Sequence, residues 1–528
     1  MKQIKHLLIT IAVLLCSATV HAYDFEVDGI YYNIVSLTDL TAKVTDGDYK
    51  YSGEIIIPST ITYKSKSLRV TEIGYGAFEN CYNLTSIEIP NSVTKIASSA
   101  FDGCSGLTSV IIGNSVTSID NYAFYNCSGL TSVVIPNTVT SIGMCAFDGC
   151  TGLTSVVVGN SVTSIGVSAF TDCTSLKNIS IGNSVISIGA GAFRRCSKLT
   201  SIIIPSSVTT IGESAFFGCY NLNELIIEDG ESELTISFNY YSNGDVKAAL
   251  FNDCNNIKTV YLGRNLDYNF DVPPPFENIK SLKSLTIGKN VKSLSNPWDG
   301  HFYGCSGLTS IYLLGTNPPN GNGNFTNNHY INTTIYVPQG SLSVYQSSDV
   351  WKNFWDIREM STTETPEEEV KKCATPVITY NDNGLDITTE TDGAEIHTDI
   401  TCSDANSYNG DRIDLSATYS ITTYATKSGY LNSDTATATL CWIAVSGSSE
   451  ENSIIEVEAM PVLITCNNGT INIRGGKDGA EVVVYTTSGV AVGNATITNG
   501  NASISTELAM GEIVVVNIAG KGIKIVMQ

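Results

Sequence analysis

The chain has 528 residues, with 29 Lys and Arg against 51 Asp and Glu, which gives a formal net charge of −22. This length allows several domains. A chain this acidic and without a basic patch argues against binding to nucleic acid or to an anionic membrane, because neither polyanion would attract it.

The N-terminus has the pattern of a secretory signal peptide. Lys2 and Lys5 precede an apolar run over residues 7–15, and residues 20–22 offer small side chains at the cleavage position. The run is too short to span a bilayer, and no later stretch approaches the roughly 20 apolar residues that a membrane helix needs. We therefore expect export without membrane insertion. Lipid attachment at Cys16 is disfavoured, because a bulky leucine precedes it.

The next residues are expected to form an N-terminal cap and a split first rung of a repeat array. Residues 54–58 read Glu-Ile-Ile-Ile-Pro, which predicts a strand. Residues 70–81 complete the same rung after a short interruption and end in Ala-Phe-Glu-Asn-Cys.

A cysteine then recurs every 23 residues, at Cys81, Cys104, Cys127, Cys150, Cys173, Cys196 and Cys219. Each one closes a copy of the pattern Leu-Thr-Ser-Ile-x-Ile-(Pro/Gly)-x-Ser-Val-Thr-x-Ile-Gly-x-x-Ala-Phe-x-x-Cys. One copy is too small to bury its own apolar side, so the copies must stack. The period therefore predicts a β-rich solenoid of 23-residue rungs with a parallel sheet.

Each rung is expected to begin with a short strand. In the copy that ends at Cys127, alternation along the strand points Val110 and Ile112 into the stack and Ser109 and Ile111 outward. The segment Ala-Phe-x-x-Cys returns apolar groups along the opposite wall, where we expect one short helical turn.

Beyond Cys219 the spacing becomes irregular. Phe251–Cys254, Phe276–Ile279 and Phe302–Cys305 mark later rungs, and the strand at residues 335–338 is the last. The aromatic residues Tyr345, Trp351, Phe354 and Trp355 are expected to cap the exposed end of the core.

The periodic cysteines are expected to form a structural column of buried, reduced thiols. Neighbouring copies should lie about 5 Å apart, the spacing of adjacent strands. Side chains that point the same way disfavour the torsion of a disulfide. Cys145 lies off this column, and Cys373, Cys402, Cys441 and Cys466 belong to later domains, so the pairing of these five stays open.

The outward strand positions form the candidate ligand-binding face. Hydroxyl side chains run beside a stripe that is first apolar and then tyrosine-bearing, and its candidate residues are Ile111, Val134, Val157, Ile203, Ile226, Tyr261, Tyr312 and Tyr336. An exposed apolar stripe of this length indicates a partner, and tyrosines commonly anchor interfaces. The alternative is that β-branched and aromatic residues simply suit strands, and both interpretations stay open.

The repeat unit resembles the leucine-rich repeat of the BspA-like family of bacterial surface proteins over roughly residues 50 to 340. Residues 23–32 are similar to the N-terminal cap of that family, and residues 336–357 resemble its C-terminal close. The resemblance implies surface exposure and, in several members, adhesion to host or bacterial proteins. It does not supply a ligand for this chain.

The remainder predicts two small all-β domains. The second one, with Val482–Gly489 and Gly511–Val526, resembles the C-terminal sorting domains of some Gram-negative bacteria. It departs from them at Glu512 and at the Met527–Gln528 end, so a plain terminal sandwich stays open. The expected organisation is a signal peptide (1–22), a cap with a split rung (23–70), the solenoid with its C-terminal cap (71–360), an acidic linker (361–372), an immunoglobulin-like β-sandwich (373–445), a linker (446–459) and a C-terminal β-domain (460–528).

Most of the excess charge lies after the repeats. Residues 361–460 carry 18 Asp or Glu against 4 Lys or Arg, so the repeats themselves are nearly uncharged. We therefore expect the array to recognise its ligand by shape, hydroxyl groups and apolar contact.

Neither catalysis nor a cofactor is expected. Beyond the signal peptide the chain keeps only His301, His329 and His397, and it lacks the common nucleophile, phosphate-loop and zinc motifs. Residues 404–411 carry oxygen ligands, but their glycine is misplaced for an EF-hand, so we expect a solvated turn and no metal site.

These features together favour a non-catalytic bacterial surface protein, exposed on the outer face of a Gram-negative cell or secreted. Its repeat face would bind an extracellular protein or glycan of the host or of other bacteria. The alternatives are a glycan-capture component, an accessory of a carbohydrate-active enzyme, and a structural spacer.

Overall fold

The computed structural model describes residues 23–237, 250–268, 273–295, 300–361, 373–381, 384–409, 412–427, 433, 436–444, 459–467, 470–486, 490–506, 513–518 and 521–526. The chain divides into two compact units, Met1–Val370 and Lys371–Gln528. The predicted signal peptide lies outside the described residues, as do the two predicted linkers except for Ser361 and Ala459.

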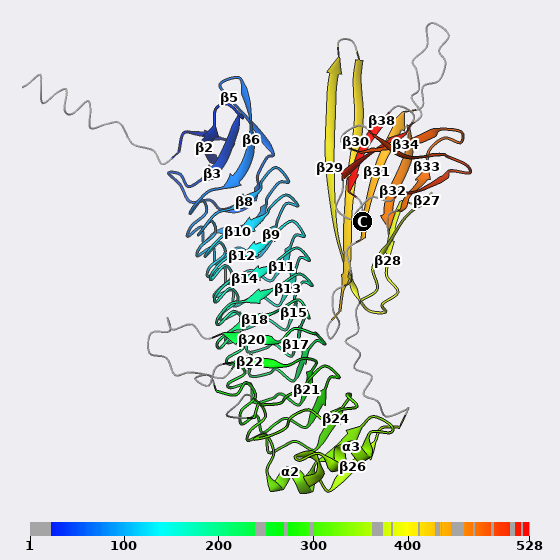
Figure 1. Cartoon of the computed structure of the whole chain (residues 1–528). Helices are drawn as coiled ribbons and strands as arrows, with labels where there is room; N and C mark the ends of the chain where they lie inside the picture. The colour runs from blue at the N-terminus through cyan, green and yellow to red at the C-terminus, as the bar shows by residue number, and fades with distance from the viewer. Residues whose placement is uncertain are drawn as a thin grey trace, which may run out of the picture. The chain divides into compact units, whose positions relative to one another are not determined.

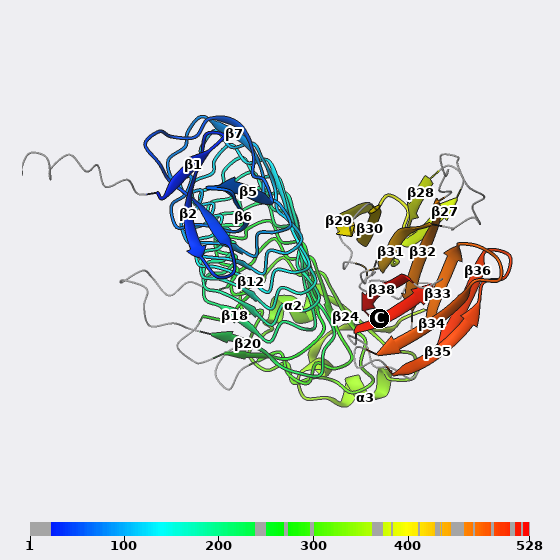
Figure 2. The same cartoon turned by 90° about the horizontal axis from the view of Figure 1, so that it is seen from above.

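The first unit is a solenoid of about 12 rungs of about 23 residues. Figure 1 shows the rungs stacked from the blue N-terminal cap to the green end with α2 and α3, and Figure 2 views the same stack from above. Each regular rung contains a longer strand, a two-residue strand and a turn segment. The predicted solenoid with parallel sheets is confirmed.

The longer strands form one side of the array, whose outer surface we call the strand face. They are β4 (Gly53–Ile56), β7 (Leu84–Glu88), β9 (Ser109–Ile111), β11 (Ser132–Ile135), β13 (Ser155–Val158), β15 (Asn178–Ser180), β17 (Ser201–Ile204), β19 (Glu224–Ile227), β21 (Thr259–Leu262), β23 (Ser284–Ile287), β24 (Ser310–Leu313), β25 (Thr334–Val337) and β26 (Asp356–Glu359). They pair in parallel as β4-β7-β9, β11-β13-β15 and β17 to β26. The register joins equal repeat positions, as in Val134 with Val157, so each position forms a column. On β11 the predicted alternation is confirmed, because Val133 and Ile135 are buried while Val134 between them is exposed; on β13 the outward Val157 is buried as well.

The short strands form a second side. They are β8 (Lys95–Ile96), β10 (Ser118–Ile119), β12 (Ser141–Ile142), β14 (Ser164–Ile165), β16 (Ser187–Ile188), β18 (Thr210–Gly212), β20 (Leu234–Ser237) and β22 (Leu266–Tyr268). Threonines before these strands tie one rung to the next, because the Thr117 Oγ1 donates to the Thr94 carbonyl at 3.0 Å and the Thr163 Oγ1 to the Thr140 carbonyl at 3.0 Å. Hydroxyl donors therefore supplement a ladder that is only two residues wide.

The third side is a series of tight turns, so the predicted short helical turn at Ala-Phe-x-x-Cys is wrong. In the rung of Phe101, Ser99 and Gly103 have φ of +54° and +73°, which interrupts any helical run. The Phe101 N–H donates to the carbonyl of Ala123 in the next rung at 2.7 Å. Alternate N–H groups of this segment donate to the next rung, and the N–H groups between them donate to carbonyls three residues earlier in the same turn.

The core of the array contains, beside its buried Leu, Ile, Val and Ala side chains, two columns of repeated residues. The first contains Phe78, Phe101, Phe124, Phe147, Phe170, Phe193, Phe216, Phe251, Phe276 and Phe302, which stack with ring centroids 4.8 to 5.5 Å apart. The second contains the periodic cysteines, which are buried in the same hydrophobic cluster. Because every rung repeats the same inward residues, the core has no internal boundary.

A cap of mixed sheet closes the N-terminal end. Its strands are β1 (Phe25–Val27), β2 (Ile30–Ser36), β3 (Thr41–Thr45), β5 (Thr60–Tyr63) and β6 (Lys66–Ile73). β1 with β2, β2 with β3 and β5 with β6 pair antiparallel, and β3 with β6 pairs in parallel. β1, β2, β3 and β6 join the ladder of short strands in one 13-stranded sheet, and β5 pairs with β6. The cap therefore covers the first rung with a buried sheet surface that contains Tyr32.

The C-terminal end is closed by α2 (Asn327–Asn332), α3 (Leu342–Ser347) and the 3-10 helix η1 (Trp351–Asn353). Tyr345, Trp351 and Phe354 are buried there, and the Trp351 Nε1 donates to the Pro319 carbonyl at 2.7 Å. The expectation that Trp355 joins this cap is wrong, because its side chain is 76% exposed. It follows the buried Phe354 in an extended segment, where successive side chains point to opposite sides.

The second unit is entirely antiparallel. Its strands are β27 (Val377–Asn381), β28 (Gly384–Thr388), β29 (Glu395–Asn409), β30 (Arg412–Thr426), β31 (Ala436–Ala444), β32 (Ala459–Asn467), β33 (Thr470–Gly475), β34 (Glu481–Thr486), β35 (Ala491–Thr496), β36 (Asn501–Ser505), β37 (Ile513–Ile518) and β38 (Lys521–Val526). One sheet has the order β29-β30-β31-β32-β33-β36, and a second has β35-β34-β37-β38. Strands of the two predicted sandwiches meet in the first sheet, where Leu440 pairs with Leu463.

Candidate functional site

The strand face presents the eight predicted ligand-binding residues in one column with unequal exposure. Ile111 and Val134 are 59% and 39% exposed, whereas Val157, Ile226 and Tyr261 are 8%, 5% and 4% exposed. Ile203, Tyr312 and Tyr336 are partly buried. Only the N-terminal part of the predicted stripe is therefore an open apolar surface.

This open part extends one strand further than the sequence indicated. Ile56 on β4 is 61% exposed, and the register aligns it with Glu88 and then with Ile111. Serines 109 and 132 are exposed beside the column. Ile56 was not among the predicted residues. The Glu-Ile-Ile-Ile-Pro strand was recognisable, but the interruption in the first rung prevents its residues from being aligned with the repeat.

The tyrosines of the column do not form an open row. The Tyr261 hydroxyl donates to the Asp229 Oδ2 at 2.7 Å, and its side chain is buried. Tyr312 and Tyr336 occupy the same position on neighbouring strands, and their rings stack with centroids 4.6 Å apart and an interplanar angle of 10°. They form a compact pair at the far end of the face from Ile111.

The periodic cysteines lie unpaired and buried in the core. Each thiol from Cys104 onward donates to the carbonyl of the core phenylalanine 26 residues earlier, as in Cys150 to Phe124 at 3.2 Å and Cys104 to Phe78 at 2.9 Å. Burial raises the pKa of the Cys150 thiol, so it stays protonated. A buried thiol whose hydrogen is engaged is a structural group and a poor nucleophile.

The cysteines whose pairing was left open have different surroundings. Cys145 is only partly buried, and burial raises its pKa to about 11. Cys373 and Cys466 are buried. The side chains of Cys402 and Cys441 lie outside the described residues.

Two histidines serve the C-terminal rungs as hydrogen-bonding groups. The His301 Nδ1 lies 2.8 Å from the Tyr268 hydroxyl, and burial lowers its pKa to about 3. The His329 Nε2 lies 3.0 Å from the Cys305 carbonyl. The side chains of His397 and of residues 404–411 lie outside the described residues. The predicted turn at residues 404–411 is wrong for residues 404–409, because they belong to β29 and pair with β30. Among the described residues, no three His, Cys, Asp or Glu side chains lie together in a way that would hold a metal ion.

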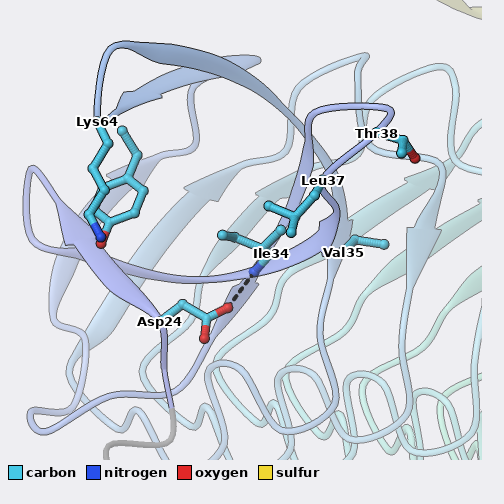
Figure 3. A pocket seen from close by; sticks show the side chains of 7 residues that line it. Asp24, Ile34, Val35, Leu37, Thr38 and Lys64 are labelled. Atoms are coloured by element: carbon cyan, nitrogen blue, oxygen red, sulfur yellow. Dashed lines mark hydrogen bonds between the residues drawn. The ribbon is translucent and has the colours of Figure 1, made fainter.

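A hollow in the N-terminal cap, with a volume of about 650 Å³, is shown in Figure 3. The Asp24 carboxylate at its edge accepts the Ile34 N–H at 2.8 Å. The Lys64 Nζ lies 4.9 Å from the centroid of the Tyr63 ring. The charged groups of this hollow are therefore already engaged by the cap itself.

A second hollow follows the turn side of the array and has a volume of about 590 Å³. Twelve residues between Asn80 and Asp172, from five successive rungs, line it, and we call it the turn groove. The repeat pattern does not reveal this groove, because its residues occupy the variable positions beside the recurring Phe and Cys of each copy.

The fold and its columns define a leucine-rich repeat solenoid. Six copies of the model for the BspA type leucine rich repeat region match residues 71–133, 117–245 and 232–349, which together exceed half of the chain. The chain belongs to the family of BspA type leucine-rich repeat proteins. No curated protein matches it.

Several solved structures are similar to this chain. A leucine-rich repeat protein from Bacteroides ovatus is 24% identical over 64% of this chain and 100% of its own, with a TM-score of 0.41. A leucine rich cell surface protein from Faecalibacterium prausnitzii is 22% identical over 66% and 97%, with a TM-score of 0.35. The pneumococcal vaccine antigen PcpA is 18% identical over 64% and 98%, with a TM-score of 0.29. Among the described residues, none of the helices has the length and apolar character needed to cross a membrane.

Proposed function

We propose that this chain is an exported, non-catalytic protein of the bacterial surface that binds an extracellular protein on its strand face. Membership of the BspA type family and the signal-peptide pattern at the N-terminus support export to the cell surface. The resemblance of residues 482–526 to the C-terminal sorting domains of some Gram-negative bacteria supports the outer face of such a cell. The observation that carries the proposal is the set of exposed apolar side chains at Ile56, Ile111 and Val134 on the strand face. Ile56 and Ile111 are in register on either side of Glu88, and Val134 holds the same repeat position one period after Ile111.

The chemistry of this row favours a protein ligand. Branched aliphatic side chains with serine hydroxyls beside them offer apolar contact and a few hydrogen bonds, as the centre of a protein interface does. A sugar ring would prefer an aromatic platform, and the tyrosines of this column lie at the other end. A passive spacer would have no reason to leave large aliphatic groups exposed in one line.

The geometry sets the size of the partner. Neighbouring rungs lie about 5 Å apart, so one rung is too narrow to hold a macromolecule. A stable interface of roughly 800 Å² per partner must cover several rungs. The outward positions of β4, β7, β9 and β11 carry two charged residues, Glu54 and Glu88, beside the apolar and hydroxyl groups, so apolar contact should dominate and raised salt should leave most of the affinity.

The test is a binding screen with the full chain lacking residues 1–22, against extracellular matrix proteins and bacterial surface proteins. For a ligand found in this way, the double substitution Ile111→Ser and Val134→Ser should weaken binding at least about tenfold, because central apolar groups carry most interface energy.

Ile186→Thr is the matched control. Ile186 is also half exposed, but it lies before β16 on the short-strand side, where other rungs carry threonine. The control should bind like the wild type. Equal binding by the double variant, or a loss of most affinity at high salt, would contradict the assignment to this face.

A further inference from the structure

The turn groove brings together side chains that sequence alone scatters over almost a hundred residues. The core phenylalanines of its five rungs stack 4.9 to 5.2 Å apart, so the groove extends over roughly 20 Å. Residues next to a stacked phenylalanine or cysteine necessarily form rows with the same spacing. The groove is therefore a ladder of side chains that repeats once per rung.

The lining consists of polar groups and aromatic rings. Its functional side chains are Tyr82, Tyr125, Asn80, Asn126, Asp102, Asp148 and Asp172, and the other lining residues are serine, threonine and glycine. An aliphatic side chain is absent from this lining, so the groove has no subsite for the apolar side chains of a peptide. Ring faces beside carboxylates, amides and hydroxyls suit a ligand that is rich in hydroxyl groups.

The backbone of the turn side cannot recruit a peptide strand. The N–H of Phe101, Gly103 and Asn126 each donate to a carbonyl of the next rung, at 2.7 to 2.8 Å. A ligand must therefore be recognised by side chains, without the main-chain pairing that a β-strand partner needs.

Two glycines leave room for the amide groups of the groove. Gly149 has φ +76°, and a Cβ atom there would lie 2.1 Å from the Asn126 Oδ1. Gly103 leaves the same room for the Asn80 amide, which also accepts the Tyr82 hydroxyl at 3.0 Å. The hydrogen bond to Tyr82 restricts the Asn80 amide before a ligand binds, and a group ordered in advance loses little entropy on binding.

The charge of the groove restricts the kind of ligand. Its lining contains three aspartates and neither lysine nor arginine. Burial, with the nearby Asp172 charge, raises the pKa of Asp148 to about 6, which reflects a poorly solvated negative site. Arg195 stands beyond the last rung of the groove, with its Nη1 3.7 Å from the Asp172 carboxylate. Sulfated or uronic-acid sugars would be repelled along the whole length.

We propose that the turn groove binds an uncharged glycan chain that runs along the axis of the array. One pyranose unit of an extended polysaccharide is close in length to one rung, so successive sugars meet equivalent side chains. The carboxylates of Asp102 and Asp148 accept from sugar hydroxyls, the Asn126 amide donates to them, and the Tyr82 ring packs on a sugar face. This site is separate from the strand face and from the protein ligand proposed there.

The probes are cellohexaose, xylohexaose, mannohexaose and chitohexaose, with a heparin hexasaccharide as the anionic comparison. Isothermal titration of the full chain lacking residues 1–22 should detect at least one of the four uncharged probes and no heparin binding. Tyr82→Ala and Asp148→Asn should each weaken that binding about tenfold or more.

Matched controls exist in rungs outside the groove. Tyr220 occupies the same repeat position as Tyr82, and Glu277 the same position as Asp148, so Tyr220→Ala and Glu277→Gln should bind like the wild type. The Ile111→Ser and Val134→Ser variant should also bind the sugar normally, which separates this site from the strand face.

Three results would overturn the proposal. The first is that none of the four uncharged probes binds. The second is that Tyr82→Ala and Asp148→Asn bind like their controls. The third is that a lysine-rich peptide binds and loses affinity in Asp148→Asn while the sugars do not, which would make the groove a site for basic peptides.

Discussion

Replacing Cys150 with serine tests the structural role of the cysteine column. The Cys150 side chain is fully buried, and its Sγ donates to the Phe124 carbonyl at 3.2 Å. That carbonyl also accepts the Cys127 N–H at 3.2 Å, so it stays partnered without the thiol. A serine oxygen is smaller than sulfur and lies closer to Cβ, so the hydroxyl would leave a gap and reach the carbonyl poorly. We expect Cys150→Ser to lower the free energy of unfolding by roughly 1 to 3 kcal/mol.

Two further variants separate the causes of this loss. Cys150→Ala removes the sulfur without burying a hydroxyl, so it should cost about 1 kcal/mol, the transfer of roughly one methylene-sized group. Cys145→Ser should change stability by less than about 0.5 kcal/mol, because the side chain is only partly buried. Serine already occupies the same repeat position at Ser99, Ser168 and Ser214, each with positive φ, so the backbone accepts it.

The assay is urea unfolding of the full chain lacking residues 1–22, followed by circular dichroism. The expected order of stability is wild type and Cys145→Ser, then Cys150→Ala, then Cys150→Ser, with equal denaturant slopes. Mass spectrometry after alkylation of unfolded, unreduced protein measures the thiols directly. Disulfide bridges among the array cysteines, or a Cys150→Ser variant as stable as the wild type, would refute the reasoning.

Three other predictions concern stability. Trp351→Ala should lower the free energy of unfolding by about 3 to 5 kcal/mol, because it leaves a cavity in the C-terminal cap and removes the hydrogen bond from Nε1 to the Pro319 carbonyl. Urea titration measures the loss, and a value below about 1 kcal/mol would contradict this role of Trp351. His301 has a pKa of about 3 in the folded chain, so the unfolded state binds more protons between about pH 6.5 and 3. Stability should therefore fall as pH falls through that window, with a slope of up to about 1.4 kcal/mol per unit that His301→Gln should reduce. The pKa of Asp148 is raised to about 6, so its ionisation weakens the fold as pH rises through that value, and Asp148→Asn should raise the melting temperature at pH 7 but not at pH 4.

Part of this structure could be predicted because the same local pattern recurs in every rung. The 23-residue period of Phe and Cys implies stacked copies, and alternation along a strand assigns Val133 and Ile135 to the core and Val134 to the surface. The inward side was therefore predictable residue by residue. It depends on periodicity and hydrophobicity, which are properties of the sequence itself.

The turn side could not be predicted in the same way. Ala-Phe-x-x-Cys resembles a helical turn locally, but the N–H of Phe101 finds its acceptor in the next rung. Left-handed residues such as Ser99 and Asn126 are tolerated because that ladder between rungs compensates for their strain. Trp355 was placed in the cap by its aromatic character, whereas the extended segment after η1 directs it outward.

The sequence by itself determined the solenoid, its family and its two interior columns, because burial of a repeated apolar pattern permits only a stack. The tertiary structure alone decided which outward positions are open, since Ile111 and Tyr261 share one column but differ from 59% to 4% in exposure. It also decided that variable positions from five rungs meet in the turn groove. Both depend on neighbours that lie a whole rung or more away in sequence, and no local pattern of residues encodes them.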